Sequence, residues 1–182
     1  EQERHDARTD SLTGLWNHRS LLQFLSHELA RARLAGGDIA LLFIDLDGFK
    51  AINDGWGHPE GDALLRRIGG VIRLATPPGG YACRYGGDEF AVLLPGAGRA
   101  EAEAVAEALR RAVAEAGQRF VPRGALPVTA SIGVASFPAR ECTVAGLVRA
   151  ANAAMYAAKD GGRNRVCAAS LLPPGRPLGY YP

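Results

Sequence analysis

Two short acidic segments combine residue types that bind metal ions. Asp45 and Asp47 directly follow residues 39–44, an uninterrupted apolar run, whereas Asp88 and Glu89 follow two glycines between two other apolar segments. Mg²⁺ prefers hard oxygen ligands and shares its coordination shell with substrate phosphates, so one or two carboxylates and a carbonyl are enough from the protein. Glycines at a turn also let the backbone approach a ligand closely, because no Cβ intervenes. The two segments are therefore candidates for a magnesium and phosphate site.

Each segment also has an ordinary structural explanation. Asp45 and Asp47 would end a strand and cap a following helix, which is the more common role of an isolated Asp-x-Asp. Gly86 and Gly87 with the acids after them are residue types that solvated hairpin turns generally use. A calcium-binding EF-hand loop is disfavoured, because its glycine belongs at the sixth position and Gly48 is the fourth residue from Asp45. Taken alone, these residues leave both explanations open.

The hydrophobic pattern predicts the elements that must position these acids. Leucines at helical spacing predict a helix over residues 18–34, and residues 39–44 are typical of a buried strand. The other expected elements are a helix through Leu64, Ile68 and Val71 that stops at residues 77–80, a tight hairpin of strands at 81–85 and 90–94, a helix over 99–116 with Gly117 as its C-cap, a strand over 128–134, a helix over 147–158 and a short strand at 165–167. This order contains a βαββαβ kernel of the ferredoxin-like kind found in polymerase palms and nucleotide cyclases. We therefore expect an α/β (α+β) fold with a central, mostly antiparallel sheet flanked by helices.

Composition limits the classes of protein that the chain resembles. Its 182 residues, 47% hydrophobic and 22% charged, suit a single globular domain, and a formal net charge of +2 gives no case for a nucleic-acid polymer as partner. Three cysteines outside any Cys-x-x-Cys pattern disfavour disulfides or zinc and fit a reducing cytosol. The charged start disfavours a signal peptide, and no apolar run is long enough for a membrane span. We expect a cytoplasmic domain, which leaves open a membrane anchor elsewhere in a longer protein.

Several ordered motifs are similar to those of the GGDEF family of diguanylate cyclases. Residues 84–90 read RYGGDEF and contain the full signature of that family. The other motifs that resemble it are residues 10–17 (DSLTGLWN), 43–54 (FIDLDGFKAIND), 57–62 (GHPEGD), 128–135 (VTASIGVA) and 159–166 (KDGGRNRV). By this resemblance residues 10–168 form a GGDEF diguanylate cyclase domain. Residues 1–9 would be an N-terminal linker and residues 169–182 a proline-rich C-terminal tail.

The resemblance implies a reaction and its metal ions. In this family two GTP molecules become cyclic di-GMP and two pyrophosphates by two-metal phosphoryl transfer, which needs positioning and charge neutralisation more than covalent help. Asp45 and Asp88 would hold two Mg²⁺ ions per active site together with GTP, assisted by the Leu46 carbonyl, with Mn²⁺ as an alternative metal. Asp88, Glu89 and Lys50 would be the catalytic residues. Whether Asp88, Glu89 or a metal-bound hydroxide accepts the proton stays open.

The resemblance also implies substrate contacts. The matching positions are Gly48, Phe49, Asn53, Asp62, Gly86, Gly87, Lys159 and Arg163. Lys159 and Arg163 would bind phosphate, and their spacing places both on one helix face if the helix continues to Arg163. Asn53 and Asp62 would read guanine, since a carboxylate accepts from its N1 and N2 hydrogens, and this favours GTP over ATP. Without the family, a solvated basic helix end and two helix caps explain the same residues.

The chain departs from the family pattern at three places. Members with product inhibition carry an R-x-x-D shortly before the signature, but residues 77–80 here read PPGG. We therefore expect that the usual inhibitory site is absent. Gly48 stands where a bulkier residue is frequent, and Asn152 where aspartate is usual. Neither change removes a predicted ligand.

The predicted chemistry requires partners. One domain offers one GTP site and the product is two-fold symmetric, so we expect a homodimer for catalysis. An N-terminal sensor or regulatory domain would control that dimer through residues 1–9. A non-catalytic GTP- or cyclic-di-GMP-binding regulatory GGDEF domain is the alternative, disfavoured by the intact acids and Lys50. A palm-type polymerase or an ATP-using cyclase is disfavoured by the predicted guanine-reading pair.

Overall fold

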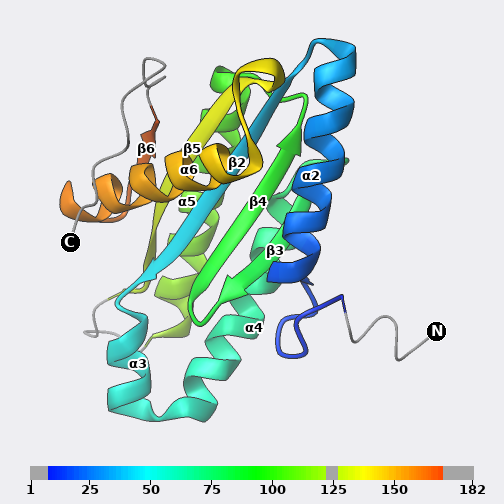
Figure 1. The fold of residues 1–182 in the computed structure, drawn as a ribbon. Coiled ribbons are helices and arrows are strands. Elements are labelled where there is room, and N and C mark those ends of the chain that lie inside the picture. Colours follow the sequence, from blue (N-terminus) through cyan, green and yellow to red (C-terminus); the bar gives the residue numbers. More distant parts are fainter. Residues whose placement is uncertain (1–7, 122–126, 170–182) are drawn as a thin grey trace.

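A computed structural model describes residues 8–121 and 127–169 of the chain (Figure 1). The elements are β1 Trp16–Asn17, α2 His18–Ala35, β2 Asp38–Asp47, α3 Phe49–Trp56, α4 His58–Ala75, β3 Tyr81–Gly86, β4 Glu89–Pro95, α5 Arg99–Phe120, β5 Thr129–Pro138, the 3₁₀ turn η1 Ala139–Glu141, α6 Val144–Asp160 and β6 Val166–Ala168. One six-stranded sheet has the order β1-β3-β4-β2-β5-β6. The central pairs β3–β4, β4–β2 and β2–β5 are antiparallel, and the two outer pairs are parallel. The predicted mostly antiparallel sheet flanked by helices is confirmed.

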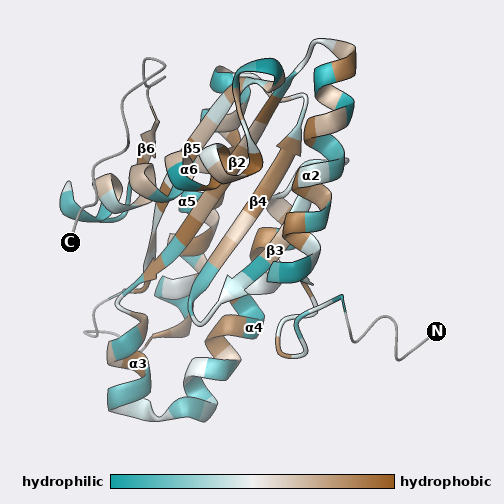
Figure 2. Ribbon diagram, in the orientation of Figure 1, coloured by the Kyte–Doolittle hydropathy of each residue, from teal (hydrophilic) through white to brown (hydrophobic). Residues whose placement is uncertain are grey.

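Strand β2 lies at the centre of two hydrophobic layers. Successive side chains of a strand point to opposite faces, so its apolar residues divide between the two sides of the sheet. Ala40, Leu42 and Ile44 pack in a cluster with α4 and α5, whereas Leu41 and Phe43 pack with α2 and α6. Figure 2 shows this core as the hydrophobic colouring of the central strands. Both faces of β2 are covered, which explains why its sequence is a continuous apolar run.

The strand is longer than its apolar run predicts. β2 continues through Asp47, so Asp45 and Asp47 are strand residues and do not lie on a loop after it. Both belong to the alternate set that faces α6, and both are buried. We expected the acids where the strand ends. They lie among the last paired residues of β2, opposite β5.

The predicted end of the helix at Gly117 is wrong. α5 continues to Phe120, and Gly117 is a buried residue within it. A Cβ atom at this position would overlap the carbonyl of Val128, the residue before β5. The glycine therefore permits a close approach of helix and strand, and it does not cap the helix.

Two further features were not predicted from periodicity. A single residue, Gly57 with φ 89°, separates α3 from α4, so these two helices follow each other almost directly. α6 ends at Asp160, and the chain then turns back before it enters β6. Apart from Arg8, Thr9 and Ala169, the predicted linker and tail lie outside the described residues. None of the helices in residues 8–121 and 127–169 is long and apolar enough to cross a membrane.

Candidate active site

The predicted acidic residues meet at one end of the sheet, the lower end in Figure 1. β2 and β4 pair so that Asp45 lies directly opposite Glu89. The backbone N–H of Leu46 donates to the carbonyl of Asp88 at 3.2 Å, which fixes the hairpin turn against the end of β2. The antiparallel register therefore brings Asp45 to Asp88 and Glu89, which are far from it in the sequence.

The hairpin between β3 and β4 is as tight as predicted. Its turn consists of Gly87 and Asp88, with Gly87 at φ 52° in the left-handed region that two-residue hairpins require. A register shift between Arg84 and Gly86 marks a bulge just before the turn. Gly86 and Gly87 are exposed, so the backbone on this side of the acids is open to a ligand.

Arg84 clamps this turn to the N-terminal motif, a contact that the sequence reasoning missed. Its Nε and Nη2 donate to the carbonyl of Gly87 at 3.0 and 2.7 Å, and its Nη1 donates to both carboxylate oxygens of Asp10. Burial raises the pKa of Asp10, but hydrogen bonds from Thr13 and the Arg84 charge outweigh it and leave the pKa lowered. Asp10 and Arg84 belong to the motifs at residues 10–17 and 84–90, so the presence of both motifs could have predicted this contact.

Asp45 is a buried carboxylate whose Oδ1 is paired with a cation. Its side chain is 9% exposed, and no neutral hydrogen-bond donor within the described residues is directed at Oδ1. The ammonium of Lys159 lies 2.7 Å from this oxygen and forms a charge-assisted ion pair with it. Burial raises the pKa of Asp45; the contact with Lys159 opposes that effect, and the charge of Asp88 adds to it, so the pKa stays raised. Such an oxygen can accept a hard cation.

Glu89 shares this electrostatic environment. Burial raises its pKa, and repulsion from Asp45 and then Asp88 raises it further, against the opposing charge of Lys159. Carboxylates that crowd together favour a proton or a cation, because either one relieves the repulsion. The cluster is therefore electrostatically prepared for positive charge.

Asp47 behaves differently from Asp45, although both are buried on the same face of β2. Its Oδ2 accepts from Thr129 Oγ1 at 2.8 Å and from the backbone N–H of Asn164 at 3.0 Å, and its Oδ1 accepts from Ser131 Oγ at 2.8 Å. The residue that precedes α3 is Gly48, and no side chain caps that helix. The alternative that these aspartates cap the next helix is therefore wrong, and Asp47 instead joins three segments of the fold.

The acidic end fits a metal ion that takes part of its shell from elsewhere. No cluster of three or more His, Cys, Asp or Glu side chains in the described part of the chain is arranged to hold a metal by itself. Asp45, the buried Leu46 in β2 and the half-buried Asp88 in the adjacent turn supply carboxylate and carbonyl oxygens at one place. Mg²⁺ commonly keeps waters and binds substrate phosphates, so a small set of protein oxygens agrees with it.

The start of α3 holds two predicted substrate contacts, Gly48 and Phe49, and the predicted catalytic residue Lys50. Gly48 precedes the helix with φ 78°, which glycine adopts without strain. Phe49 buries its side chain in the core, whereas Lys50 is exposed. The first N–H groups of a helix lack intrahelical partners and favour anions. This helix start directly follows the acidic end of β2.

Lys159 and Arg163 do not share a helix face, because the helix does not continue to Arg163 as that prediction required. Two glycines follow α6, which ends at Asp160, and Arg163 lies on the following loop with φ 63°. Arg163 is exposed, whereas Lys159 contacts Asp45 from the last turn of the helix. The alternative that Lys159 is only a solvated residue at a helix end is therefore wrong, because its side chain contacts the acidic cluster.

Asn53 and Asp62 come from the two helices that flank Gly57. A Cβ atom at Gly61 would overlap Asn53 Oδ1 and lie 3.2 Å from Phe49 Cζ, so the Asn53 side chain passes directly over the residue before Asp62. Both predicted guanine readers are half-buried, and within the described residues neither side chain forms a hydrogen bond. The caps of α3 and α4 involve the backbone of Gly57. The capping alternative is therefore wrong for this pair too.

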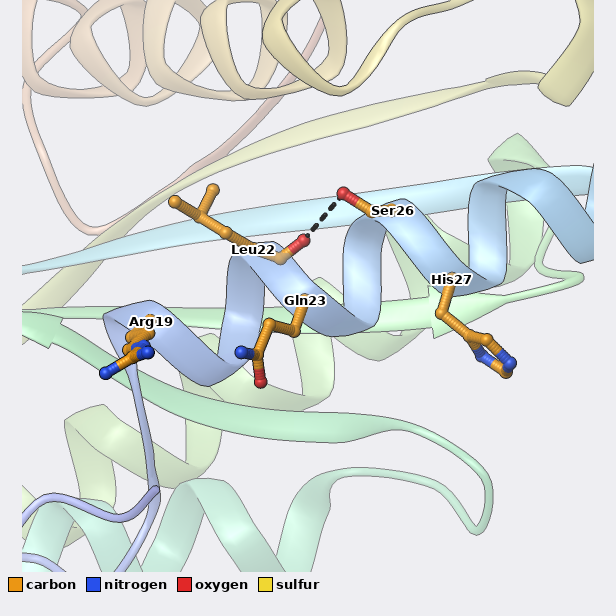
Figure 3. A pocket seen from close by; sticks show the side chains of 5 residues that line it. All are labelled: Arg19, Leu22, Gln23, Ser26 and His27. Atoms are coloured by element: carbon orange, nitrogen blue, oxygen red, sulfur yellow. Dashed lines mark hydrogen bonds between the residues drawn. The ribbon is translucent and has the colours of Figure 1, made fainter. Parts of the chain in front are cut away.

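A shallow surface hollow lies elsewhere, on the outer face of α2. Its lining consists of Arg19, Leu22, Gln23, Ser26 and His27, and the Ser26 hydroxyl donates to the Leu22 carbonyl at 3.0 Å (Figure 3). None of these residues belongs to the predicted site. The open shape and the single-helix lining give no reason to place the substrate there.

Known proteins share both the sequence and the fold. Residues 7–165 match the family described as "Diguanylate cyclase, GGDEF domain". The chain is 39% identical to the diguanylate cyclase DgcP of Pseudomonas aeruginosa, over 91% of this chain and 24% of that protein. It is 40% identical to the response regulator PleD of Caulobacter vibrioides, over 88% of this chain and 36% of that protein. The chain therefore spans only about a quarter to a third of these two relatives.

A solved structure shows the same arrangement of elements. The crystal structure of the coiled coil and GGDEF domain of DgcB from Caulobacter crescentus, in complex with c-di-GMP, matches with a TM-score of 0.83 and 36% identity. The match covers 92% of this chain and 88% of that one. Sequence and fold therefore agree over almost all of the described residues.

Proposed function

The chain belongs to the GGDEF family of diguanylate cyclases, and on that premise we propose that it condenses two GTP molecules into cyclic di-GMP and two pyrophosphates. The observation that carries the proposal is the convergence of Asp45, Asp88 and Glu89 at the end of β2, where Asp45 Oδ1 has only the Lys159 ammonium as its partner. Neighbouring carboxylates that raise one another's pKa, as Asp45 and Glu89 do, are typical of functional sites. The intact cluster favours turnover over a purely regulatory binding role.

Cyclases of this family generally use a divalent metal, and we propose Mg²⁺, two ions per active site with GTP, or Mn²⁺ in its place. Asp45, Asp88 and the Leu46 carbonyl would hold them. When bound, the metals would neutralise phosphate charge and activate the attacking hydroxyl. Lys159 stands beside the same carboxylate and would add a cation for the triphosphate. Glu89, whose pKa is raised by burial and its acidic neighbours, is suited to accept a proton at that place.

The remaining substrate contacts follow from the ends of the helices. The backbone N–H groups at the start of α3, beside Gly48 and Phe49, and the exposed Lys50 would bind phosphate, together with Arg163 and the turn glycines. Asn53 and Asp62 would read the guanine edge, because their polar atoms are free of other hydrogen bonds within the described residues. These contacts would make GTP the substrate rather than ATP.

We also propose that the chain acts as a homodimer and that it lacks product inhibition through residues 77–80. Each domain would bind one GTP, so two copies face each other across a two-fold axis to join their substrates. The turn at residues 77–80 is closed by a hydrogen bond from Gly80 N–H to the Pro77 carbonyl at 3.0 Å, and it contains no charged side chain. Product inhibition through this turn is therefore not expected. In a longer cytoplasmic protein, an N-terminal sensor domain would control the dimer.

The test is to incubate the purified chain with Mg²⁺ and either GTP or ATP and to separate the products by chromatography. Cyclic di-GMP and pyrophosphate are expected from GTP alone. Asp88→Ala should bind no productive metal and form no product, while its thermal unfolding stays close to wild type. GTP binding without product would identify a regulatory domain instead, and product from ATP would contradict the roles of Asn53 and Asp62.

Binding of cyclic di-GMP tests the expected absence of product inhibition. Cyclic di-GMP should bind weakly and be displaced when the site is saturated with a non-hydrolysable GTP analogue. Tight binding that survives saturation and is lost on changes to residues 77–80 would refute this part of the proposal.

A further inference from the structure

The loop after α6 holds a strained backbone. Arg163 and Asn164 have φ values of 63° and 45°, a left-handed conformation that residues with a Cβ seldom adopt. Directly after them, the carbonyl of Arg165 accepts from the N–H of Ile132 at 2.9 Å, so the chain must turn sharply to begin β6. Such a conformation persists only where the surroundings fix it.

Three hydrogen bonds from three elements fix this loop. The N–H of Asn164 donates to Asp47 Oδ2 at 3.0 Å, and its side-chain Oδ1 accepts from Arg110 Nη1 at 2.8 Å. The N–H of Arg163 donates to the carbonyl of Ala158 at 3.0 Å. The backbone on both sides of the Arg163 side chain is therefore held by β2, α5 and α6 together.

The two groups that hold Asn164 are themselves fixed. Asp47 accepts from the hydroxyls of Thr129 and Ser131 in β5. Arg110 is only 20% exposed and donates from Nε and Nη2 to the two oxygens of Glu107, at 2.8 and 2.7 Å. An arginine that forms two parallel hydrogen bonds with a carboxylate has a defined orientation, so its remaining Nη1 points in a fixed direction.

We propose that Asn164 is a positioning residue for the phosphate contact of Arg163, and that Arg110 on α5 is part of the same device. The inference rests on the proposed function, because it takes Arg163 as a ligand of the triphosphate. Arg163 is exposed and long, so the direction from which its guanidinium can reach a phosphate depends on a fixed backbone at its Cα. Asn164 supplies that fixed backbone, with its N–H bound on one side and its side chain on the other.

A residue outside the acidic cluster should therefore control affinity for GTP. A displacement of about 1 Å in a positioning group costs up to about 100-fold in rate, and loss of a supporting group typically costs about 10- to 100-fold in affinity. Arg111 provides an internal control, because it binds the same Glu107 at 3.0 Å without a hydrogen bond to Asn164. The two neighbouring arginines thus differ in one relevant contact.

The experiment compares Arg110→Gln and Asn164→Ala with Arg111→Gln in the full chain. Binding of a non-hydrolysable GTP analogue is measured by calorimetry with Mg²⁺, and steady-state kinetics give KM and kcat. Arg110→Gln and Asn164→Ala should raise Kd and KM about tenfold and change kcat much less. Arg111→Gln should match wild type. Asn164→Asp, which keeps the backbone N–H and the acceptor for Arg110, should restore most of the affinity.

A double-mutant cycle with Arg163→Ala separates positioning from general damage. In that background, Arg110→Gln and Asn164→Ala should have no further effect on Kd, since the group that they position is gone. Undiminished effects there, or equal Kd values for Arg110→Gln and Arg111→Gln, would overturn the proposal. If wild type itself does not bind the analogue, the proposed function fails instead, so the two failures are distinguishable.

Discussion

Asp45 and Asp47 lie on the same face of β2, each with 6% of its surface exposed, and yet they have opposite hydrogen-bonding environments. Asp47 accepts three hydrogen bonds from neutral donors, whereas Asp45 Oδ1 is paired only with the ammonium of Lys159 within the described residues. The strand register alone does not explain this difference, because Ser131 lies opposite Asp45 but its hydroxyl donates a hydrogen bond to Asp47. The Ser131 hydroxyl therefore serves Asp47 and not the carboxylate opposite it.

The difference shows how one strand can serve both stability and chemistry. A buried carboxylate that accepts several hydrogen bonds is stable in its charged form and fixes the segments around it. A buried carboxylate without them is held at a cost in free energy, which a cation or proton relieves. We infer that Asp47 maintains the architecture and that Asp45 is kept available for a metal.

The largest expected effect is that of Asp45→Asn on turnover. The substitution keeps the volume and removes the charge that would hold the metal, so cyclic di-GMP formation should fall by at least about 100-fold. The free energy of unfolding without Mg²⁺ and GTP should change by less than about 1 kcal/mol, because the raised pKa of Asp45 means that burial of its charge offsets the ion pair with Lys159. Initial rates and denaturant titrations test the two halves. A large loss of stability with unchanged turnover would reverse the assigned roles.

The matched change, Asp47→Asn, should act in the opposite way. Its amide would face the donors that now point at a carboxylate, and loss of hydrogen bonds to a buried charged group costs about 1.5–3 kcal/mol. We expect the free energy of unfolding to drop by about that amount, measured by denaturant titration. Turnover at saturating GTP should stay well above that of Asp45→Asn. Ser131→Ala, which removes one donor and leaves the carboxylate, should show a smaller loss.

The sequence alone predicted the fold and the convergence of the acids. The apolar run of β2, the hairpin and the helical spacings are local patterns, and local patterns indicate elements reliably when several agree. The roles of Asp45 and Asp47 could not be separated in this way, because they depend on which hydroxyls of β5 reach which carboxylate. The end of α6 before Arg163 depended on the return of the chain to β6, and the place of Gly117 on its contact with Val128.

The proposed guanine-reading pair extends the comparison, since the side chain of Asn53 forms no hydrogen bond within the described residues. A methyl group at Gly61 would overlap Asn53 Oδ1, so the amide must move aside, and it would lie 3.2 Å from Phe49 Cζ in the core, which must shift slightly. Gly61→Ala should therefore lower stability by about 1 kcal/mol and raise KM for GTP about tenfold, in the range for loss of one hydrogen-bonding contact. Gly55→Ala in α3, which meets no atom within 4 Å, is the control.

Steady-state kinetics with GTP and ATP decide this point. Gly61→Ala should narrow the preference for GTP, whereas Gly55→Ala should keep it. An equal loss in both variants would mean that the effect comes from helix propensity, and Asn53 would then have no demonstrated part in base recognition.

The smallest expected effect concerns Asp10, which resembles Asp47 in accepting several hydrogen bonds at the other side of the hairpin. Its pKa is lowered from 3.8, because hydrogen bonds from Thr13 and the Arg84 charge outweigh the burial that raises it. A carboxylate with a lowered folded pKa contributes stability that is present above pH 3.8 and is lost as pH falls through the folded value. Asp10→Asn should therefore cost about 1 kcal/mol near neutral pH.

That stability difference between wild type and Asp10→Asn should shrink as the pH falls below 3.8, since wild type then loses the same charge. Denaturant titrations at several pH values measure it. Glu103→Gln is the control, because its pair with Arg99 is 41% and 61% exposed and should contribute almost nothing at any pH. A difference that persists unchanged to the lowest pH would show that Asp10 acts through its shape rather than its charge. The hydrogen bonds from Arg84 to the Gly87 carbonyl would then not depend on the charge of Asp10.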